Sequence, residues 1–282
     1  MKPLGPIPAG FTAINGELAI GGRKASDLVA EAGRTPLFVY SRERIAARVA
    51  QLRAALPSEV TLNYAVKANP FAPVLGHMAG LVDGFDIASG GELKLVQGAG
   101  IDPARVSFAG PGKRDDELEA AILAGVTLNL ESEGEAERAL AIAGRLGVVP
   151  KLAVRVNPDF DLKGSGMKMG GGAKPFGIDA ERVPALVKRL LSDGADWRGF
   201  HIFAGSQALD AAAIIETQAQ TIALAARLTT EAGATPPKVN LGGGFGIPYF
   251  PGDEPLDLGA VGQALREQLG RLPSVLAGTA FC

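Results

Sequence analysis

The chain has 282 residues, of which 47% are hydrophobic and 21% charged, and its formal net charge is −2. This composition excludes an intrinsically disordered chain and suffices for one large α/β barrel or two smaller domains. The absence of a basic excess argues against nucleic acid or an anionic membrane as a partner. The single cysteine, Cys282, excludes a disulfide framework. No signal-peptide core and no run approaching roughly 20 apolar residues is visible, so we expect a soluble, cytoplasmic protein.

Short β-branched runs alternate with longer segments rich in Ala, Leu, Glu and Arg, which is typical of parallel strands joined by crossover helices. Residues 1–36 differ, because GELAIGG alternates like a solvent-facing strand and a short helix is expected at Ala25–Ala32. We therefore separate an N-terminal segment, residues 1–36, from a barrel, residues 37–282. The expected strands are Leu37–Tyr40, Val60–Val66, Val82–Ala88, Val106–Ala109, Val126–Leu130, Leu152–Val156, Phe200–Phe203 and Val239–Leu241. The expected helices are Glu43–Leu56, Glu92–Gly98, Arg114–Ala124, Glu133–Leu146, Ala180–Leu191, Ala211–Ala232 and Leu258–Leu269.

Polar residues and glycines collect directly after these strands. In an α/β barrel, such positions all lie on the face formed by the carboxyl ends of the strands, where active sites are built. Polar loops are common, but seven of them in concert favour an enzyme. The residues concerned are Lys67, Asn69, Ser89, Gly90, Gly110 to Lys113, Glu131, Asn157, Gly205 to Gln207 and Gly242 to Gly244.

Lys67 lies in NYAVKANP, at the end of an apolar strand. Lysine is almost never buried without a reason. Desolvation lowers a lysine pKa, and the neutral amine is the form that attacks an aldehyde. The alternative is a lysine that simply reaches solvent from a strand end.

A glycine run, VNLGGGFGIPY, follows the last clear strand. Gly242, Gly243 and Gly244 allow backbone N–H groups to converge on a phosphate. A tight turn is the plain alternative. A dinucleotide-binding fingerprint fits poorly, because Ile247 occupies its third glycine position.

The segment GFHIFAGSQ ends another strand. Ser206 offers a hydroxyl and a backbone N–H to a phosphate or a ring oxygen. Phe203 is expected to point into the barrel mouth from the same strand face as His201. A single histidine such as His201 is more often a core residue than a catalyst.

Three charged residues near strand ends are further candidates. Asp86 could neutralise a lysine or order a hydrogen bond to a ring. Glu92 opens a helix, where the helix dipole alone favours an acid. Arg155 lies inside a strand and requires an acidic partner or an anionic ligand, because an unpaired buried charge is costly.

The glycine-rich segment KGSGMKMGGGAKPFGI is longer than most barrel connections. Lys168 or Lys174 could meet a phosphate or a carboxylate there, and a mobile lid is the alternative. We expect no metal site, since His77, His201 and one terminal cysteine cannot form a standard zinc cluster.

Together these segments resemble the fold-type III pyridoxal-phosphate decarboxylases, the diaminopimelate, ornithine and arginine decarboxylase group. The matching segments, in the family's order, are YAVKAN, FDIASGGEL, ESEGEAERAL, RVNP, PFGI, GFHIFAGSQ and LGGGFGIPY. GSGMKMGGG and HIFAGSQ particularly resemble a subgroup found beside exosortase and exopolysaccharide genes. That subgroup is similar to decarboxylases that act on carrier-protein-bound amino acids.

The resemblance implies a (βα)8 barrel of the alanine racemase and ornithine decarboxylase type that binds pyridoxal 5'-phosphate. It implies an amino acid or an aminoacyl carrier protein as substrate, and a homodimer as the full-length form. Phe203 stands where diaminopimelate decarboxylases have a histidine stacked on the pyridine ring, and His201 is counted among the cofactor-binding residues. By match to the motifs, Lys67 is the Schiff-base lysine, Ser206 and Gly242 to Gly244 grip the phosphate, and Asp86, Glu92 and Arg155 form the charged network around them.

Family members continue past Cys282 with a strand bearing Glu-x-Gly-Arg and a β domain, which residues 1–36 would join. We therefore expect seven of the eight barrel strands, an open sheet edge, and no decarboxylation by this chain alone. The alternatives are an amino-acid racemase and a non-catalytic pyridoxal-phosphate-binding protein. The long GGGFGIPY and HIFAGSQ matches favour the decarboxylases, and a Rossmann-type dehydrogenase is the weakest option.

Overall fold

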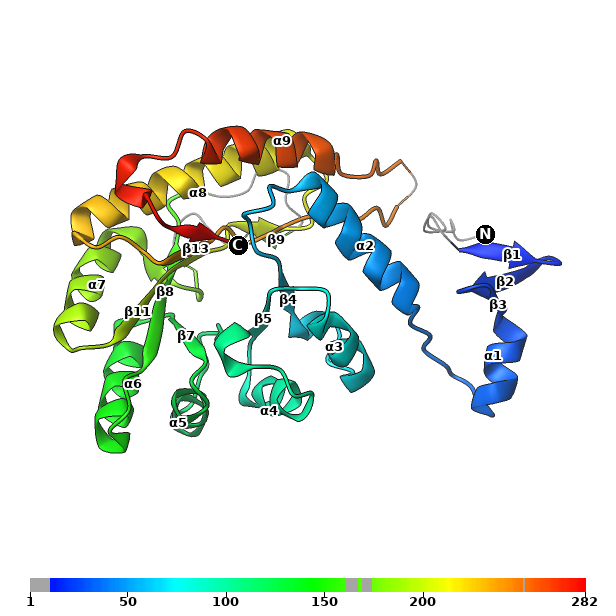
Figure 1. Ribbon diagram of the computed structural model, residues 1–282, viewed down its shortest axis with the longest axis horizontal. Coiled ribbons are helices and arrows are strands. Elements are labelled where there is room, and N and C mark those ends of the chain that lie inside the picture. Colours follow the sequence, from blue (N-terminus) through cyan, green and yellow to red (C-terminus); the bar gives the residue numbers. More distant parts are fainter. Residues whose placement is uncertain (1–10, 161–166, 169–173, 251) are drawn as a thin grey trace.

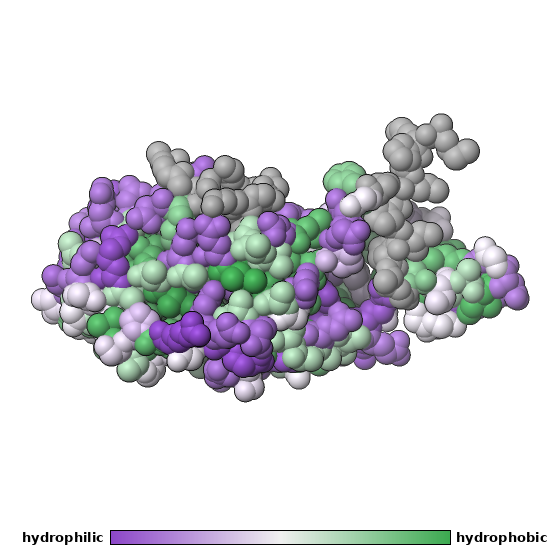
Figure 2. All heavy atoms as spheres, turned by 90° about the horizontal axis from the view of Figure 1, so that it is seen from above, coloured by the Kyte–Doolittle hydropathy of each residue, from purple (hydrophilic) through white to green (hydrophobic). Residues whose placement is uncertain are grey.

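The computed structural model describes residues 11–160, 167–168, 174–250 and 252–282. The chain forms a small N-terminal lobe and a larger barrel (Figure 1). The lobe is a three-stranded antiparallel sheet followed by a helix, with the bounds β1 Thr12–Ile14, β2 Glu17–Ile20, β3 Arg23–Lys24 and α1 Ala25–Ala32. The expected helix at Ala25–Ala32 is thus confirmed, and β2 is the alternating strand in GELAIGG. In the space-filling view, the lobe projects from one end of the larger body (Figure 2).

The segment that joins the lobe to the barrel is not a strand, and our prediction of one at Leu37–Tyr40 is wrong. Its residues pair with no described strand, and the side chains are open to solvent, with Phe38 81% and Tyr40 49% exposed. An apolar, aromatic composition favours a strand only where a neighbouring strand supplies hydrogen bonds and side-chain contacts. Here the ring of Tyr40 lies beside that of Phe71, at 6.2 Å between centroids, and gains no strand partner among the described residues.

Eight parallel strands form the barrel sheet, and neighbours along the chain are neighbours in the sheet. This order is what right-handed βαβ units produce. In sheet order the strands are β4 Asn63–Ala65, β5 Gly84–Ile87, β6 Val106–Phe108, β7 Thr127–Leu130, β8 Lys151–Asn157, β11 Asp196–Ile202, β13 Lys238–Asn240 and β14 Ala280–Phe281. Three short strands complete the described set: β10 Ile178–Asp179 pairs with β8, and β9 Met167–Lys168 pairs antiparallel with β12 Gly205–Ser206.

Helices cover the outside of the sheet (Figure 1). The sequence did not indicate α3, because a proline and a glycine interrupt its short apolar pattern. Pro73 lies in its first turn, where a missing N–H has no cost. Among the described residues, no helix combines the length and apolar character needed to cross a membrane. The barrel helices are α2 Arg42–Ala55, α3 Ala72–Ala79, α4 Gly90–Gly98, α5 Asp115–Ala124, α6 Glu133–Leu146, α7 Val183–Ser192, α8 Ala211–Ala232 and α9 Leu258–Leu269.

The sheet holds one strand more than the seven expected, and this corrects our prediction of an open edge. Phe281 of β14 pairs with Val239 of β13 on one side and forms a parallel bridge to Val60 on the other. Thr61 N donates to Phe281 O at 2.9 Å, and the Thr61 hydroxyl lies 3.2 Å from the same oxygen. The first and last strands therefore meet. A two-residue strand has no periodicity that could indicate it in the sequence.

The barrel axis is polar. Strand pairing places Asp86 beside Ser107, Asn129 beside Ala153, and His201 between Arg155 and Asn240. The apolar residues point the other way, and Phe85, Phe108, Leu128, Leu152 and Ile202 form one cluster with the inner faces of the helices. A barrel interior is usually filled by bulky branched side chains. Here a cavity of about 310 Å³, lined among others by Asn63, Ser107, Asn129 and Asn240, extends into it.

Closure also depends on the crossing of the first and last barrel helices, and this yields a prediction. At Gly262 of α9, an added Cβ would lie 1.9 Å from the carbonyl oxygen of Ala55 in α2. We expect Gly262→Ala to lower the free energy of unfolding by about 1–3 kcal/mol, because the helices must separate. The matched control is Gly144→Ala in α6, where a Cβ meets nothing within 4 Å; it should raise stability by up to about 1 kcal/mol. Urea unfolding measures both, and equal effects would contradict the close crossing.

Candidate active site at the carboxyl ends of the strands

Lys67 lies just beyond β4, in the single 3-10 turn Val66–Ala68. Val66 is fully buried, whereas Lys67 is exposed, so the amine reaches solvent rather than sitting in an apolar pocket. The turn is held from both sides, because the Tyr64 hydroxyl donates to Asn69 O at 3.1 Å and Phe71 N donates to the Asn69 side chain at 3.0 Å. The strand end thus presents an accessible lysine on a restrained backbone.

Asp86 lies on the neighbouring strand, in register with Ala65. Its Oδ1 accepts hydrogen bonds from Ser107 Oγ at 2.6 Å and from Asn63 Nδ2 at 3.2 Å. Burial raises the pKa of Asp86, although both of these bonds act in the opposite direction. Within the described residues it forms no ion pair, so it faces Lys67's strand as part of a polar network rather than as a salt bridge.

Glu92 behaves as a helix-capping residue. Its Oε2 accepts from Ala88 N at 2.6 Å, and its own N–H donates to Ser89 Oγ at 3.2 Å. The Ser89 hydroxyl thus caps α4, and the Glu92 carboxylate binds the backbone N–H of the residue before this cap. The alternative considered for Glu92, a first-turn acid, is therefore what the geometry shows, and among the described ion pairs it joins no charged network.

Arg155 has the acidic partner that its position requires. Its Nη1 lies 2.9 Å from Oε1 of Glu131, and the two side chains are 9% and 1% exposed. The guanidinium also lies over the ring of Phe176, 4.8 Å from the centroid. The sequence indicated that a partner must exist but did not identify Glu131, which comes from the end of another strand.

A second buried ion pair was not foreseen. Lys113 Nζ lies 2.6 Å from Oε1 of Glu135, with side-chain exposures of 1% and 2%. Lys113 also donates to Gly110 O at 2.8 Å and to Asn129 O at 2.9 Å, so its three protons have partners. Burial raises the pKa of the Glu135 carboxyl, and Lys113 beside it acts in the opposite direction. An acid three residues after the capping Ser132 was the available signal, but it suggests a cap and not a pair.

His201 extends from β11 into the barrel, between Arg155 and Asn240. Its Nδ1 atom is enclosed and has no hydrogen-bond partner among the described residues. Burial, followed by the positive charges of Arg155, Lys113 and Lys67, lowers the pKa of His201 to about 3. The imidazole is therefore neutral near pH 7.

The glycine run and the segment around Ser206 lie together at the mouth. Ala208 N donates to Gly244 O at 2.9 Å, and Gly246 N donates to Ala208 O at 2.8 Å. Gly242 has a φ of +77°, and a Cβ there would lie 2.8 Å from Ile202 O and 2.9 Å from a ring carbon of Phe203. A side chain at this position would collide with the Ile202 carbonyl and the Phe203 ring, so glycine lets the run pack closely against the end of β11.

Free donors line the same place. The N–H groups of Gly243 and Gly244 and the hydroxyl of Ser206 donate to no described residue. Unused N–H groups on a glycine backbone, close to a hydroxyl, suit a phosphate group. The residues present therefore fit the phosphate of the cofactor that the sequence indicated.

Part of the expected site is not described. Residues 161–166 and 169–173 of the glycine-rich segment, together with the side chain of Lys168, lie outside the described residues. Lys174 is described and partly buried. No cluster of three or more histidine, cysteine, aspartate or glutamate side chains that could hold a metal occurs in the described part of the chain.

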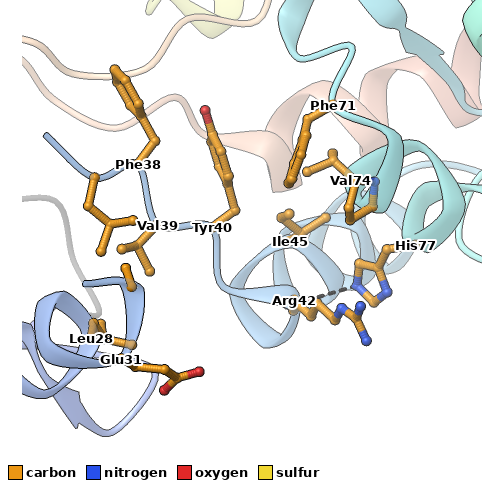
Figure 3. A pocket seen from close by; sticks show the side chains of 13 residues that line it. Leu28, Glu31, Phe38, Val39, Tyr40, Arg42, Ile45, Phe71, Val74 and His77 are labelled. Atoms are coloured by element: carbon orange, nitrogen blue, oxygen red, sulfur yellow. Dashed lines mark hydrogen bonds between the residues drawn. The ribbon is translucent and has the colours of Figure 1, made fainter. Parts of the chain in front are cut away.

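A separate cleft of about 420 Å³ lies between the lobe and the barrel. It is lined by Leu28 and Glu31 of α1, by residues 37–40, by the first turn of α2, and by side chains in and just before α3 (Figure 3). His77 closes its floor by contacting Arg42 O through Nε2 at 3.0 Å. None of the predicted site residues lines this cleft, so it is distinct from the barrel mouth.

The lowered pKa of His201 generates a prediction on stability. Below pH 6.5 the unfolded chain gains a proton at this histidine that the folded chain does not bind until about pH 3. Stability is therefore complete above pH 6.5 and is lost as the pH falls through this window. Between pH 7 and pH 5, the wild type should lose about 1–2 kcal/mol more stability than His201→Gln. Urea unfolding at the two pH values measures the difference, and parallel losses would show that His201 is not enclosed.

Comparison with known proteins places the chain in a family. Residues 42–279 match the family described as "Pyridoxal-dependent decarboxylase, pyridoxal binding domain". Diaminopimelate decarboxylase of Neisseria meningitidis serogroup A is 39% identical over 251 residues, which is 86% of this chain and 60% of that protein. The L-glutamyl-[BtrI acyl-carrier protein] decarboxylase of Niallia circulans is 32% identical over 80% of this chain and 54% of its own length.

Solved structures of diaminopimelate decarboxylases share the fold of this chain. Diaminopimelate decarboxylase from M. jannaschi superposes with a TM-score of 0.85 at 26% identity, covering 96% of this chain and 65% of that one. The Helicobacter pylori enzyme in complex with L-lysine gives a TM-score of 0.80 at 27% identity over 91% of this chain. The chain thus spans about 60% of the length of its curated relatives. Sequence motifs, barrel and family match together show that it belongs to the pyridoxal-dependent decarboxylases and comprises their pyridoxal-binding barrel.

Proposed function

We propose that this barrel serves an enzyme that decarboxylates an L-amino acid, a carboxy-lyase, with Lys67 carrying pyridoxal 5'-phosphate. The observation that supports this most is the placement of three features on one barrel face. An exposed lysine follows β4, a neutral histidine extends from β11, and free N–H donors follow β13. The carboxyl ends of barrel strands are where such groups cooperate.

Different residues would hold the phosphate, the ring and the reactive carbon of the cofactor. Ser206 and the N–H groups of Gly243 and Gly244 would bind the phosphate, and Phe203, beside Gly242, would lie against the ring. Lys67 would hold the reactive carbon. When bound, the cofactor supplies an electron sink for the charge left when carbon dioxide departs.

Charged and titratable side chains would set the electrostatic surroundings of the bound cofactor. Glu131 holds Arg155, so a guanidinium is available at the mouth for a carboxylate or an oxygen of the cofactor. His201 stays neutral, so it can share a hydrogen bond without adding a third positive charge beside Arg155 and Lys67. Asp86 supplies a hydrogen-bonded carboxyl next to the strand of Lys67.

Two substrate classes are consistent with the relatives. The diaminopimelate decarboxylases suggest a free diaminopimelate-like amino acid, and the Niallia circulans protein suggests an amino acid carried by an acyl carrier protein. The HIFAGSQ and GSGMKMGGG segments, which resemble the exosortase-associated subgroup, favour the carrier-bound class. We further propose a homodimer as the functional form, with residues 1–36 packed on the β domain of the complete enzyme.

The assignment of Lys67 is tested by covalent labelling. Incubation with pyridoxal phosphate, reduction with borohydride and peptide mapping should place the label on Lys67. Lys67→Ala should abolish the visible absorption of the bound cofactor, whereas Lys94→Ala, at an exposed position in α4, should leave it unchanged. A label on another lysine with Lys67 unmodified would overturn the assignment.

The phosphate site is tested by comparing two ligands. Ser206→Ala should weaken pyridoxal phosphate binding about tenfold or more, since a hydrogen bond to a charged group contributes about 1.5–3 kcal/mol. Binding of pyridoxal, which lacks the phosphate, should change less than twofold. Fluorescence titration measures both affinities, and equal losses for the two ligands would place the phosphate elsewhere.

A further inference from the structure

We infer that Glu131 is a positioning residue, which fixes Arg155 and the end of the glycine-rich segment at the barrel mouth. The inference rests on the proposed function only in taking the mouth as the place where cofactor and substrate bind. Its physical basis is one carboxylate that gathers donors from three separate parts of the chain.

The contacts of Glu131 use both carboxylate oxygens. Oε1 accepts from Arg155 Nη1 at 2.9 Å and from the N–H of Gly110. Oε2 accepts from the N–H of Gly177 at 3.0 Å. An ionised carboxylate only accepts hydrogen bonds, and its three partners among the described residues are all donors. At 1% side-chain exposure, no solvent competes for them.

Both backbone donors belong to glycines at positions where a residue with a side chain would be strained or would clash. Gly177 has a φ of +77°, and a Cβ there would lie 2.8 Å from Asn157 N and 3.0 Å from Arg155 O. Gly110 has a φ of +130°, and a Cβ would lie 3.3 Å from Ala88 O. Residues other than glycine rarely adopt these φ angles. Both loops are therefore shaped so that an N–H points at the same carboxylate.

The second buried ion pair, Lys113 with Glu135, also holds the backbone of Glu131. Oε2 of Glu135 accepts the backbone N–H of Glu131 at 3.3 Å, while Oε1 of Glu135 pairs with Lys113. Lys113 in turn donates to Gly110 O, so the loop that contacts Glu131 is also tied to this pair. Each of the four buried side chains is thus paired with one of opposite charge.

Glu131 fixes the position of the Arg155 side chain. Its guanidinium is held between Glu131 and the ring of Phe176, and Phe176 directly precedes Gly177. Arg155 is also the strand neighbour of His201, and among the nearby positive charges it lowers the His201 pKa most. Glu131 thus sets the position of a cation, an aromatic ring and a loop end together, and through Arg155 it sets the electrostatic surroundings of His201.

The experiment compares Glu131→Gln and Glu131→Asp with the control Glu137→Gln. Glu137 lies on α6 with its side chain 59% exposed and pairs with Arg189 at the surface. Glu131→Gln turns an NH₂ group toward donors, so pyridoxal phosphate should bind at least tenfold more weakly. The pH at which the absorption of the bound cofactor changes should shift. Glu131→Asp keeps the charge and should fall between wild type and Glu131→Gln, and Glu137→Gln should match the wild type.

A double-mutant cycle tests whether Glu131 acts through Arg155. In an Arg155→Met background, Glu131→Gln should change affinity less than twofold, because its target is already gone. Additive losses would overturn the inference. So would a Glu131→Gln or Glu131→Asp variant that melts earlier yet keeps the wild-type affinity and pH dependence, since that outcome describes a purely structural residue.

A measurement without cofactor separates this inference from the proposed function. Phenylglyoxal should modify Arg155 slowly in the wild type and about tenfold faster in Glu131→Gln, as mapped by mass spectrometry, with Glu137→Gln unchanged. Equal modification rates in all three proteins would reject the role of Glu131, whatever the cofactor assay shows. Failure of the wild type to bind pyridoxal phosphate, with faster modification in Glu131→Gln, would reject the proposed function and leave the positioning role standing.

Discussion

A charge inside a barrel must be paired, and the arrangement of the mouth follows from this constraint. Removing one partner from a buried ion pair costs about 3–5 kcal/mol, because the other charge is left uncompensated. Arg155 and Lys113 both point inward, and each meets a carboxylate supplied by the ESEGE segment at the end of β7. Arg155 of β8 and Lys113 of the loop between β6 and α5 are thereby tied to one short stretch of chain. The spacing of Glu131 and Glu135 across the start of α6 sets the spacing of the cations.

The uncharged polar side chains along the barrel axis are paired in the same way as the charges. Amide and hydroxyl side chains inside the sheet satisfy one another, as in the bonds from Asn129 to Ser107 and from Ser107 to Asp86. The apolar residues that stabilise the fold are displaced to the layer between sheet and helices. The hydrophobic stabilisation and the polar site therefore occupy opposite faces of the same strands, which alternation of side chains along a strand permits. A residue can be changed on one face with limited effect on the other.

Closure of the sheet brings the parts of the site into range. Lys67 follows the first barrel strand and the glycine run follows the seventh, so in an open sheet they would stand at opposite ends. The bridge between Phe281 and Val60, together with the close crossing of α2 and α9, brings the two edges around to each other. A two-residue strand contributes little energy by itself. It matters because it joins the two ends of the sheet.

The sequence by itself determined the class of fold, the order of the barrel helices except α3, and the motifs that identify the family. These features are local, since periodicity, glycine runs and strand-end lysines depend on neighbours along the chain. It also determined that Arg155 needs a partner, because the cost of an unpaired charge is general. Only the tertiary structure decided which residue that partner is, because Glu131 is 24 positions away and reaches Arg155 through strand pairing. In the same way, it decided that Leu37–Tyr40 pairs with no described strand and that Ala280–Phe281 does pair with one. Both outcomes depend on which distant segment lies alongside, and local patterns do not carry that information.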